Sequence, residues 1–316
     1  MTERRLFHWR EGRMPSIKHI LCPIDFSGVS THTVEQAVAV ASLYQARILG
    51  LHVSPPIALP IPDAPAPEGL LPGTELQHVR ARTADYFRAA TAAGIGVDVL
   101  IDVGDPAGVI LDRATRLAAD LIVIGTHGTR GFEHLVLGSV TEKVLRKATC
   151  PVLTVPPRAK ATSQLSFRRL LCAVDFSEWS LEALKLAVSF AQESGATLTL
   201  LHVLEWPWHE PPPPAFDDLP IAQADALRSH RQYLEATVLT RLGTLVPEKL
   251  AGRVTVAQRV SHGKPYVEIL RVAAEDKADL IVLGVHGRRA IDVLLLGSTT
   301  NQLVRQATCP VLTQRR

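Results

Sequence analysis

Short apolar runs of strand length alternate along the chain with longer segments in which apolar residues recur at helical spacing. In the first half of the chain, the apolar runs predict strands at 17–24, 46–53, 97–103, 121–124 and 152–155. The segments between them predict helices at 30–45, 74–93, 105–118 and 139–147. Strands that are apolar on both faces belong in a parallel sheet with helices on either side. Because crossovers between parallel strands are right-handed, the pattern predicts a doubly wound α/β sheet.

The second half of the chain repeats the first. Leu21–Ser27 matches Leu171–Ser177 at an offset of 150 residues, and Ala148–Thr154 matches Ala307–Thr313 at an offset of 159 residues. The change of offset indicates a net insertion of nine residues in the middle of the second copy. Self-similarity over such a length predicts two homologous domains in tandem.

We therefore expect two tandem doubly wound domains, each with a five-stranded parallel sheet of the Rossmann-like type, packed as a pseudo-dimer. The last strands, Pro151–Val155 and Pro310–Thr313, are sheet edges that favour pairing with each other. The expected organisation is an N-terminal tail at 1–17, a first domain at 18–155, a linker at 156–166 and a second domain at 167–314. Pro-rich stretches predict surface loops over one end of each domain, at 55–72 and 207–220.

Composition narrows the class of protein. Of the 316 residues, 47% are hydrophobic and 21% are charged, as in ordinary globular proteins. The net charge of +3 is small and dispersed, so we expect no nucleic-acid partner. No apolar run approaches the roughly 20 residues of a membrane helix, so we expect no membrane partner.

The N-terminal tail is either disordered or reflects a start codon that belongs at Met14. A membrane-touching tail is a third alternative, for which Leu6, Phe7 and Trp9 are weak anchors.

The spacing of the cysteines favours a role in core packing over a role in metal binding or redox chemistry. The chain has four, which are Cys22, Cys150, Cys172 and Cys309. None forms a C-x-x-C pair, so their spacing excludes the usual zinc and thioredoxin-type motifs. They pair with one another as repeat equivalents, which favours a packing role. Because the N-terminal residues lack the apolar segment of a secretory signal, we expect a cytoplasmic protein with free thiols.

The segment after the fourth strand carries the same glycine pattern in both copies. In the first copy, Gly125 and Gly128 are followed after nine residues by Gly138 and Ser139. The second copy repeats the residue types and the interval at Gly284, Gly287, Gly297 and Ser298. Ser139–Glu142 also has the form of a capping box, which predicts a helix N-terminus there. Glycines next to a helix N-terminus expose backbone N–H groups that attract phosphate. The alternative is that the glycines only form turns and the serine only caps its helix.

This pattern resembles the universal stress protein family, in which G-x2-G-x9-G-[S/T] follows the fourth strand and an aspartate ends the first. The resemblance covers both domains and leaves out only the tail, the linker and the Pro-rich loops. Family members with this motif bind ATP, so the resemblance implies ATP, with Mg²⁺ on its phosphates, in both copies. It also implies that the aspartate faces the ribose, that the backbone ending strand two meets the adenine, and that the glycine loop holds the phosphates.

Carried over onto this sequence, the motif gives one set of binding residues in each copy. With a loop arginine added for its charge, the first set is Pro23, Ile24, Asp25, Val53, Gly125, Gly128, Arg130, Gly138, Ser139 and Val140. The second set is Val174, Asp175, Val203, Gly284, Gly287, Arg289, Gly297, Ser298 and Thr299. The second copy departs mildly, because Ala173 replaces Pro23 and Thr299 replaces Val140.

Several of these residues also have a simpler interpretation. An aspartate at the end of a strand, such as Asp25 or Asp175, often only caps the following turn. Arg130 and Arg289 either reach a phosphate or remain solvated charges of the loop.

The repeated histidines allow two roles. His127 and His286, which lie between the paired glycines, either touch phosphate or make a backbone bond within a turn. His52 and His202 end a strand, and we expect them to pack there. Neither copy has histidines at the local spacing of metal ligands.

Three classes of function remain open. The first is a regulatory stress-response protein that changes conformation, protein partner or oligomeric state with ATP. The second is a slow ATP hydrolase, although the sequence shows neither a Walker A motif nor the residue set of fast phosphoryl transfer. The third is an interaction module with vestigial sites. Pairing of two whole chains into a homodimer is compatible with each of them.

Overall fold

The computed structural model describes residues 15–55, 73–127, 137–157, 167–205, 220–285 and 296–315. The residues before position 15, most of both Pro-rich stretches and most of the linker lie outside this part of the chain.

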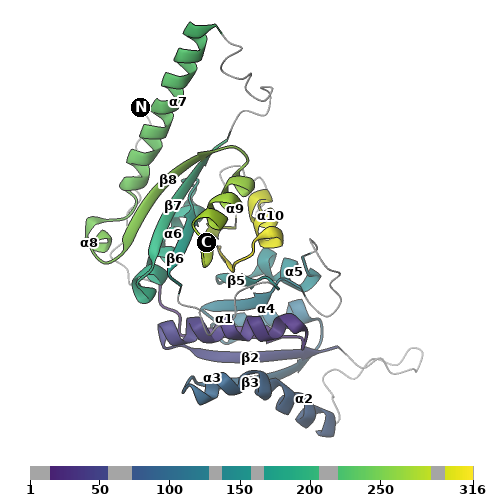
Figure 1. Cartoon of the computed structure of the whole chain (residues 1–316). Helices are drawn as coiled ribbons and strands as arrows, with labels where there is room; N and C mark the ends of the chain where they lie inside the picture. Colours follow the sequence, from purple (N-terminus) through teal and green to yellow (C-terminus); the bar gives the residue numbers. More distant parts are fainter. Residues whose placement is uncertain are drawn as a thin grey trace, which may run out of the picture.

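The first domain alternates strands and helices as its apolar pattern predicts (Figure 1). Its elements are β1 (His19–Ile24), α1 (Gly28–Tyr44), β2 (Arg47–Ser54), α2 (Gly73–Tyr86), α3 (Arg88–Ala92), β3 (Val97–Val103), α4 (Pro106–Arg116), β4 (Leu121–Gly125), α5 (Ser139–Lys147) and β5 (Val152–Val155). The single helix predicted at 74–93 is wrong, because the backbone leaves helical geometry at Phe87, between α2 and α3. The buried Phe87 ring packs over Gly50, a contact that only a residue without a β-carbon permits.

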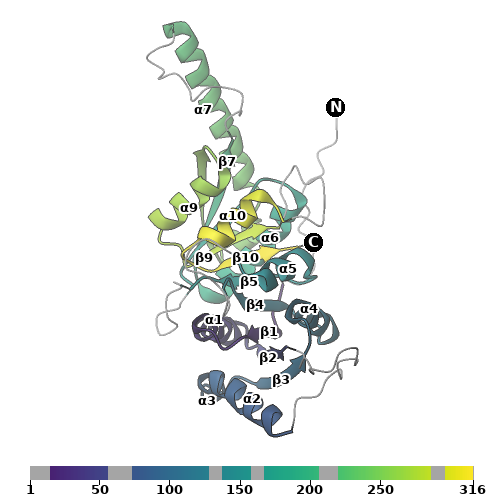
Figure 2. The same ribbon diagram turned by 90° about the vertical axis from the view of Figure 1, so that its right-hand side faces the viewer.

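The second domain repeats the order of elements. It contains β6 (Arg169–Ala173), α6 (Glu178–Ser194), β7 (Thr197–Leu204), α7 (Ile221–Gly243), α8 (Glu248–Ala251), β8 (Thr255–His262), α9 (Pro265–Glu275), β9 (Leu280–Gly284), α10 (Ser298–Gln306) and β10 (Val311–Gln314). Between β7 and β8, where the sequence carries its insertion, α7 has 23 residues whereas α2 has 14. Both views show α7 extending well beyond the sheet (Figures 1 and 2).

The ten strands found in the described residues form one sheet with the order β3-β2-β1-β4-β5-β10-β9-β6-β7-β8. Within each domain the neighbouring strands are parallel, and the domains meet where β5 pairs antiparallel with β10. Two reciprocal side-chain bonds strengthen this junction. The Thr154 hydroxyl donates to the Val311 carbonyl at 3.1 Å, and the Thr313 hydroxyl donates to the Val152 carbonyl at 3.1 Å. The predicted pseudo-dimer, joined through its last strands, is confirmed.

The sheet separates two apolar cores, and each core runs through both domains. Side chains of α1 and α6 pack in the core on one face, and side chains of α4, α5, α9 and α10 pack in the core on the other. Such two-sided burial explains why the central strands are continuous apolar runs. In the described parts of the chain, no helix is long and apolar enough to cross a membrane.

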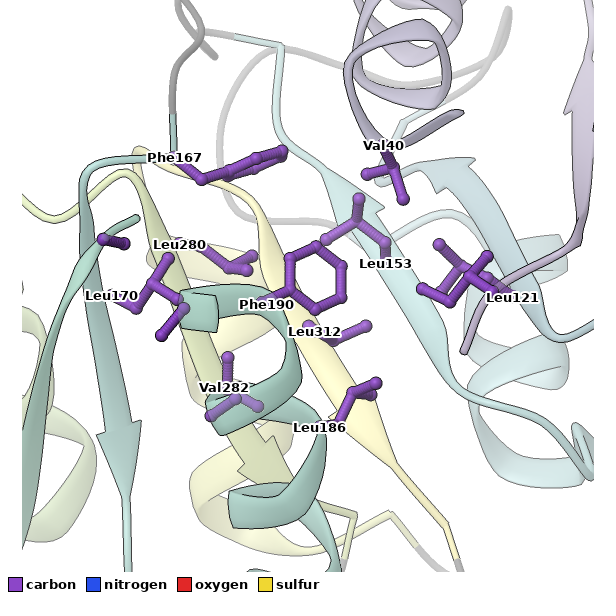
Figure 3. Packing of buried hydrophobic residues seen from close by; sticks show 14 of the residues in the cluster. Val40, Leu121, Leu153, Phe167, Leu170, Leu186, Phe190, Leu280, Val282 and Leu312 are labelled. Carbon is purple, nitrogen blue, oxygen red and sulfur yellow. The ribbon is translucent and has the colours of Figure 1, made fainter. Parts of the chain in front are cut away.

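Helices α1 and α6 close the first core over the junction between the domains. Figure 3 shows Phe190 of α6 beside Leu153 of β5 and Leu312 of β10. The Tyr44 ring meets Phe190 edge-on at 5.2 Å, and its hydroxyl lies 3.0 Å from the Ser189 hydroxyl. The two domains therefore share one continuous hydrophobic core as well as one sheet.

Candidate functional site

The carboxyl end of β1 is the place where the winding of the first domain reverses, because the chain proceeds to β2 on one side of β1 and to β4 on the other. Ligands of doubly wound sheets bind at such a point. Asp25 lies there and is exposed. Its Oδ1 accepts hydrogen bonds from the Ser27 N–H and from the Ser30 hydroxyl, each at 3.0 Å. Asp25 therefore does cap the turn into α1, whatever else it binds.

The equivalent turn of the second domain uses its first serine differently. Asp175 Oδ1 accepts from the Ser177 N–H at 2.9 Å and from the Ser177 hydroxyl at 2.5 Å. The same hydroxyl oxygen accepts from the Ser180 N–H at 3.2 Å and so caps α6. In the first domain the hydroxyl of Ser27 is buried without a hydrogen-bond partner and leaves α1 without a side-chain cap. The two aspartate turns thus differ in the hydrogen bonds that their first serine makes.

A phenylalanine beside each aspartate has a left-handed backbone. Phe26 has φ +60° and Phe176 has φ +62°, a conformation that is unfavourable for a bulky residue. The Phe26 ring stacks on the His52 imidazole at 4.1 Å, and the Arg82 guanidinium covers its other face at 4.1 Å from the ring centre. This ring stack holds Phe26 in its strained conformation, since stacking and cation–π contacts supply favourable energy.

The second domain brings the same three residue types together, although its two rings are tilted by 42° to each other. The Phe176 ring lies 4.8 Å from the His202 ring, and the Arg241 guanidinium lies 3.9 Å from its centre. In both domains the histidine is buried and its Nδ1 donates to the carbonyl of the residue that precedes the aspartate, at 3.0 Å in the first domain and 2.6 Å in the second. Burial lowers the pKa of His52 below its ordinary value. The expected packing role of both histidines agrees with these contacts.

The segment after β4 is fastened to the first turn of α5. The Thr141 hydroxyl donates to the Gly125 carbonyl at 2.7 Å, and the Gly138 N–H donates to the Thr126 carbonyl at 2.9 Å. The helix begins where it was predicted, but the capping box is wrong. The N-cap is Gly138, which has no side chain, and Ser139 is the first helical residue. The bonds to Gly125 and Thr126 take over the positioning that a capping box would provide.

The same arrangement follows β9. Thr300 donates its hydroxyl to the Gly284 carbonyl at 3.1 Å, and the Gly297 N–H donates to the Val285 carbonyl at 3.1 Å. Gly297 is the N-cap of α10 and Ser298 is its first residue. Both helix N-termini therefore have a glycine cap and no side-chain cap.

The first glycine of each motif has a packing role. A β-carbon on Gly125 would lie 3.0 Å from Val29 and 3.1 Å from Thr33 of α1. A β-carbon on Gly284 would lie 2.7 Å from the backbone of Trp179 in α6. These glycines are needed because the helix after the first strand crosses close to the end of the fourth. Their presence is explained without a ligand.

The structure brings together most of the residues predicted for the two sites. Asp25 directly follows β1, and Gly125 is the last residue of the adjacent strand β4. Gly138 is the N-cap of α5, Ser139 is its first residue, and Val53 lies near the end of β2. The corresponding residues of the second domain have equivalent positions. Outside the described residues lie Gly128, Arg130, His286, Gly287 and Arg289.

Sequence reasoning missed the arginines of the ring stacks. Arg82 and Arg241 are separated by 159 residues, the offset of the second half of the repeat, so the sequence did contain a signal. The signal is weak because the surrounding helix positions differ between the copies. Only the fold shows that α2 and α7 bring these arginines over the phenylalanines.

Comparison with known proteins places this architecture in a known class. The fold is similar to that of a solved universal stress protein from Archaeoglobus fulgidus, with a TM-score of 0.61 over 94% of this chain and 98% of that chain. At 23% sequence identity, this likeness concerns the fold.

The chain belongs to the universal stress protein family, whose profile matches residues 16–156 and 166–315. A universal stress protein of Mycolicibacterium smegmatis is 28% identical over 309 residues, which cover 94% of this chain and 96% of that protein. Universal stress protein MJ0531 of Methanocaldococcus jannaschii is 33% identical over 141 residues, which cover 44% of this chain and 81% of that protein. The resemblance seen in the sequence is thus confirmed, and it supports a stress-response role.

Proposed function

We propose that each domain binds one ATP, with Mg²⁺ on its phosphates, and that nucleotide occupancy controls the conformation of the chain or its binding to a protein partner. The observation that carries this proposal is the uncapped helix N-terminus fastened to the end of the fourth strand, one strand away from the aspartate turn. It occurs in both domains.

The phosphate part of the proposal follows from the hydrogen bonds at the start of α5. The first N–H groups of a helix have no acceptor within the helix. At this helix the Gly138 N–H is already bound to Thr126, and the Gly138 carbonyl accepts from the Glu142 N–H. The N–H groups of Ser139 and Val140 follow, and the N-cap offers them no side-chain acceptor. With the helix dipole, they form a suitable site for an anion.

The sugar part of the proposal rests on the aspartate turn. Oδ1 of Asp25 accepts the two hydrogen bonds of the turn. Because a carboxylate accepts up to about four hydrogen bonds, the Asp25 carboxylate can also accept one from a ribose hydroxyl. The Arg82 guanidinium beside this turn adds positive charge, which favours an anionic ligand. When bound, Mg²⁺ would neutralise part of the phosphate charge.

Replacing the first helical residue by proline tests the phosphate site without removing the helix. Proline is tolerated at this position and deletes one N–H group. Gly138 has φ −58° and ψ 137°, and Gly297 has φ −55° and ψ 143°, which suit a residue before proline. The chain already starts α4 with Pro106 and α9 with Pro265.

Titration calorimetry with MgATP would measure the effect. The wild-type chain is expected to bind at two sites, and Ser139→Pro and Ser298→Pro are each expected to weaken one of them by about 10- to 100-fold, the value of a hydrogen bond to a charged group. Ser139→Ala and Ser298→Ala retain the N–H and serve as matched controls with smaller losses. Unchanged MgATP affinity in folded proline variants would contradict phosphate binding at these helices. Failure of the wild-type chain to bind MgATP would favour an interaction module.

A further inference from the structure

A second kind of binding site lies at the opposite, amino end of the strands in the second domain. A cavity of about 410 Å³ opens there between the starts of β6 and β7, the middle of β8 and the end of α9. Its size suits a small-molecule ligand. Arg169 and Thr197 pair at the first positions of their strands, whereas Asp175 lies two residues beyond the last residue of β6. This amino-end pocket is therefore separate from the proposed nucleotide site.

The first domain fills the same place with leucines. Leu100 pairs with Leu51 on β2 as Arg259 pairs with Leu201 on β7, so Leu100 and Arg259 are equivalent. By the same correspondence, Thr199 replaces Leu49, and Asp276 replaces Leu117 at the end of the helix. Leu49 is buried in the core on this side of the sheet, and Leu100 and Leu117 are partly buried and pack against that core.

Two further replacements open the space. In the first domain the Arg47 and Asp98 side chains form an ion pair at 2.9 Å across the strands. Thr197 and Ala257 occupy the equivalent positions of the second domain and line the amino-end pocket. Five positions thus differ between the copies, because three leucines are replaced by polar residues and one ion pair is replaced by a threonine and an alanine.

Stability does not explain this exchange. Arg259 pairs with Asp276 at 3.1 Å and with Glu275 at 2.5 Å, and all three side chains are partly exposed. Partly exposed ion pairs contribute little free energy, whereas packed leucines contribute substantially more. The polar residues at these positions are therefore better explained by the binding of a ligand than by a contribution to the free energy of folding.

The pocket is lined by two arginines and one aspartate, of which Arg259 and Asp276 form an ion pair with each other. Arg169 donates its Nε–H to the Lys277 carbonyl at 3.2 Å and pairs with no carboxylate within the part of the chain that the structure describes. Asp276 is bound through Oδ1 to Arg259. The Thr197 and Thr199 hydroxyls line the same cavity. A ligand that complements this lining carries an anionic group for Arg169 and a cationic donor for Asp276.

We propose that the amino-end pocket binds a small zwitterion of the α-amino-acid type. Its carboxylate pairs with the Arg169 guanidinium, its ammonium group pairs with Asp276, and the threonine hydroxyls contact its remaining polar atoms. The pocket lies within the second domain, so its ligand is sensed by that half of the pseudo-dimer.

Calorimetry with the common free α-amino acids, each paired with its N-acetyl and its amide form, tests the proposal. At least one amino acid is expected to bind with a dissociation constant of about 1 mM or tighter, and removal of either ligand charge should weaken binding about tenfold or more. Arg169→Gln should weaken it similarly. The triple variant Thr199→Leu, Arg259→Leu and Asp276→Leu, which copies the first domain, should remain folded by circular dichroism and lose binding.

Three results would overturn the proposal. They are no binding of any free amino acid to the wild-type chain, equal binding of the N-acetyl or amide form, and unchanged binding by the triple variant. Inorganic phosphate that binds with the same dependence on Arg169 and displaces the amino acid fully would also overturn it, since a plain anion would then suffice.

Discussion

Gln36 on α1 offers a sharp test of how the two domains pack. Its side chain is 0% exposed, and neither Nε2 nor Oε1 has a hydrogen-bond partner. It lies one helical turn before Val40, on the face of α1 that also carries Tyr44 toward α6. The equivalent residue of the second domain, 150 positions later, is Leu186 on α6, which is also buried.

Replacement of Gln36 by leucine should stabilise the chain. A buried polar group without a partner costs about 1–3 kcal/mol, and leucine removes that penalty while it adds apolar contact. We therefore expect the free energy of unfolding to rise by about 1–3 kcal/mol, and the melting temperature to rise by about 2–4 °C per kcal/mol. Urea denaturation followed by circular dichroism would measure the first quantity, and calorimetry the second.

The reverse substitution at the matched position is the control. Leu186→Gln should destabilise the chain, because it adds a buried amide and removes apolar contact. If Gln36→Leu leaves the free energy of unfolding unchanged or lowers it, the buried amide is not a penalty, and the reasoning is refuted.

Three further predictions concern the core, the ring stack and the thiols. Leu153→Ala, at a fully buried residue paired with Leu312, should lower the free energy of unfolding by about 2–5 kcal/mol, measured in urea; a loss well below 1 kcal/mol would contradict the shared core. Because burial lowers the pKa of His52, the unfolded chain binds more protons below its ordinary pKa of about 6.5, so stability should fall as the pH decreases below that value. In His52→Asn the fall should be shallower, and an identical pH profile of urea midpoints would contradict the assignment. Burial raises the pKa of Cys172 to about 12, so a thiol reagent should label Cys172 only after unfolding; rapid labelling of the native chain would contradict its burial.

The predictable part of this fold is the part that sequence periodicity encodes. β3, α5 and β5 begin and end where the apolar pattern predicts, because buried parallel strands and amphipathic helices leave distinct spacings. The pairing of β5 with β10 followed from two exposed edges. By contrast, the break at Phe87 depends on its contact with Gly50 on a neighbouring strand, which no local pattern records.

The candidate site was only partly predictable for the same reason. The glycine and aspartate positions are local in the sequence and repeated, so self-comparison found them. The stack of Arg82, Phe26 and His52 joins three elements, and it becomes visible only when α2 is placed over the β1–α1 turn. The capping box failed because Gly138, directly before Ser139, takes the cap position and its N–H is fixed by Thr126.

The amount of ATP that the purified chain carries tests the central proposal most directly. The chain is purified without added nucleotide, incubated with MgATP, freed of unbound ligand and denatured, and the released nucleotide is identified by chromatography and mass. Close to two ATP per wild-type chain, and close to one in Ser139→Pro and in Ser298→Pro, is the predicted result. A wild-type chain that releases no nucleotide after this incubation would contradict the account.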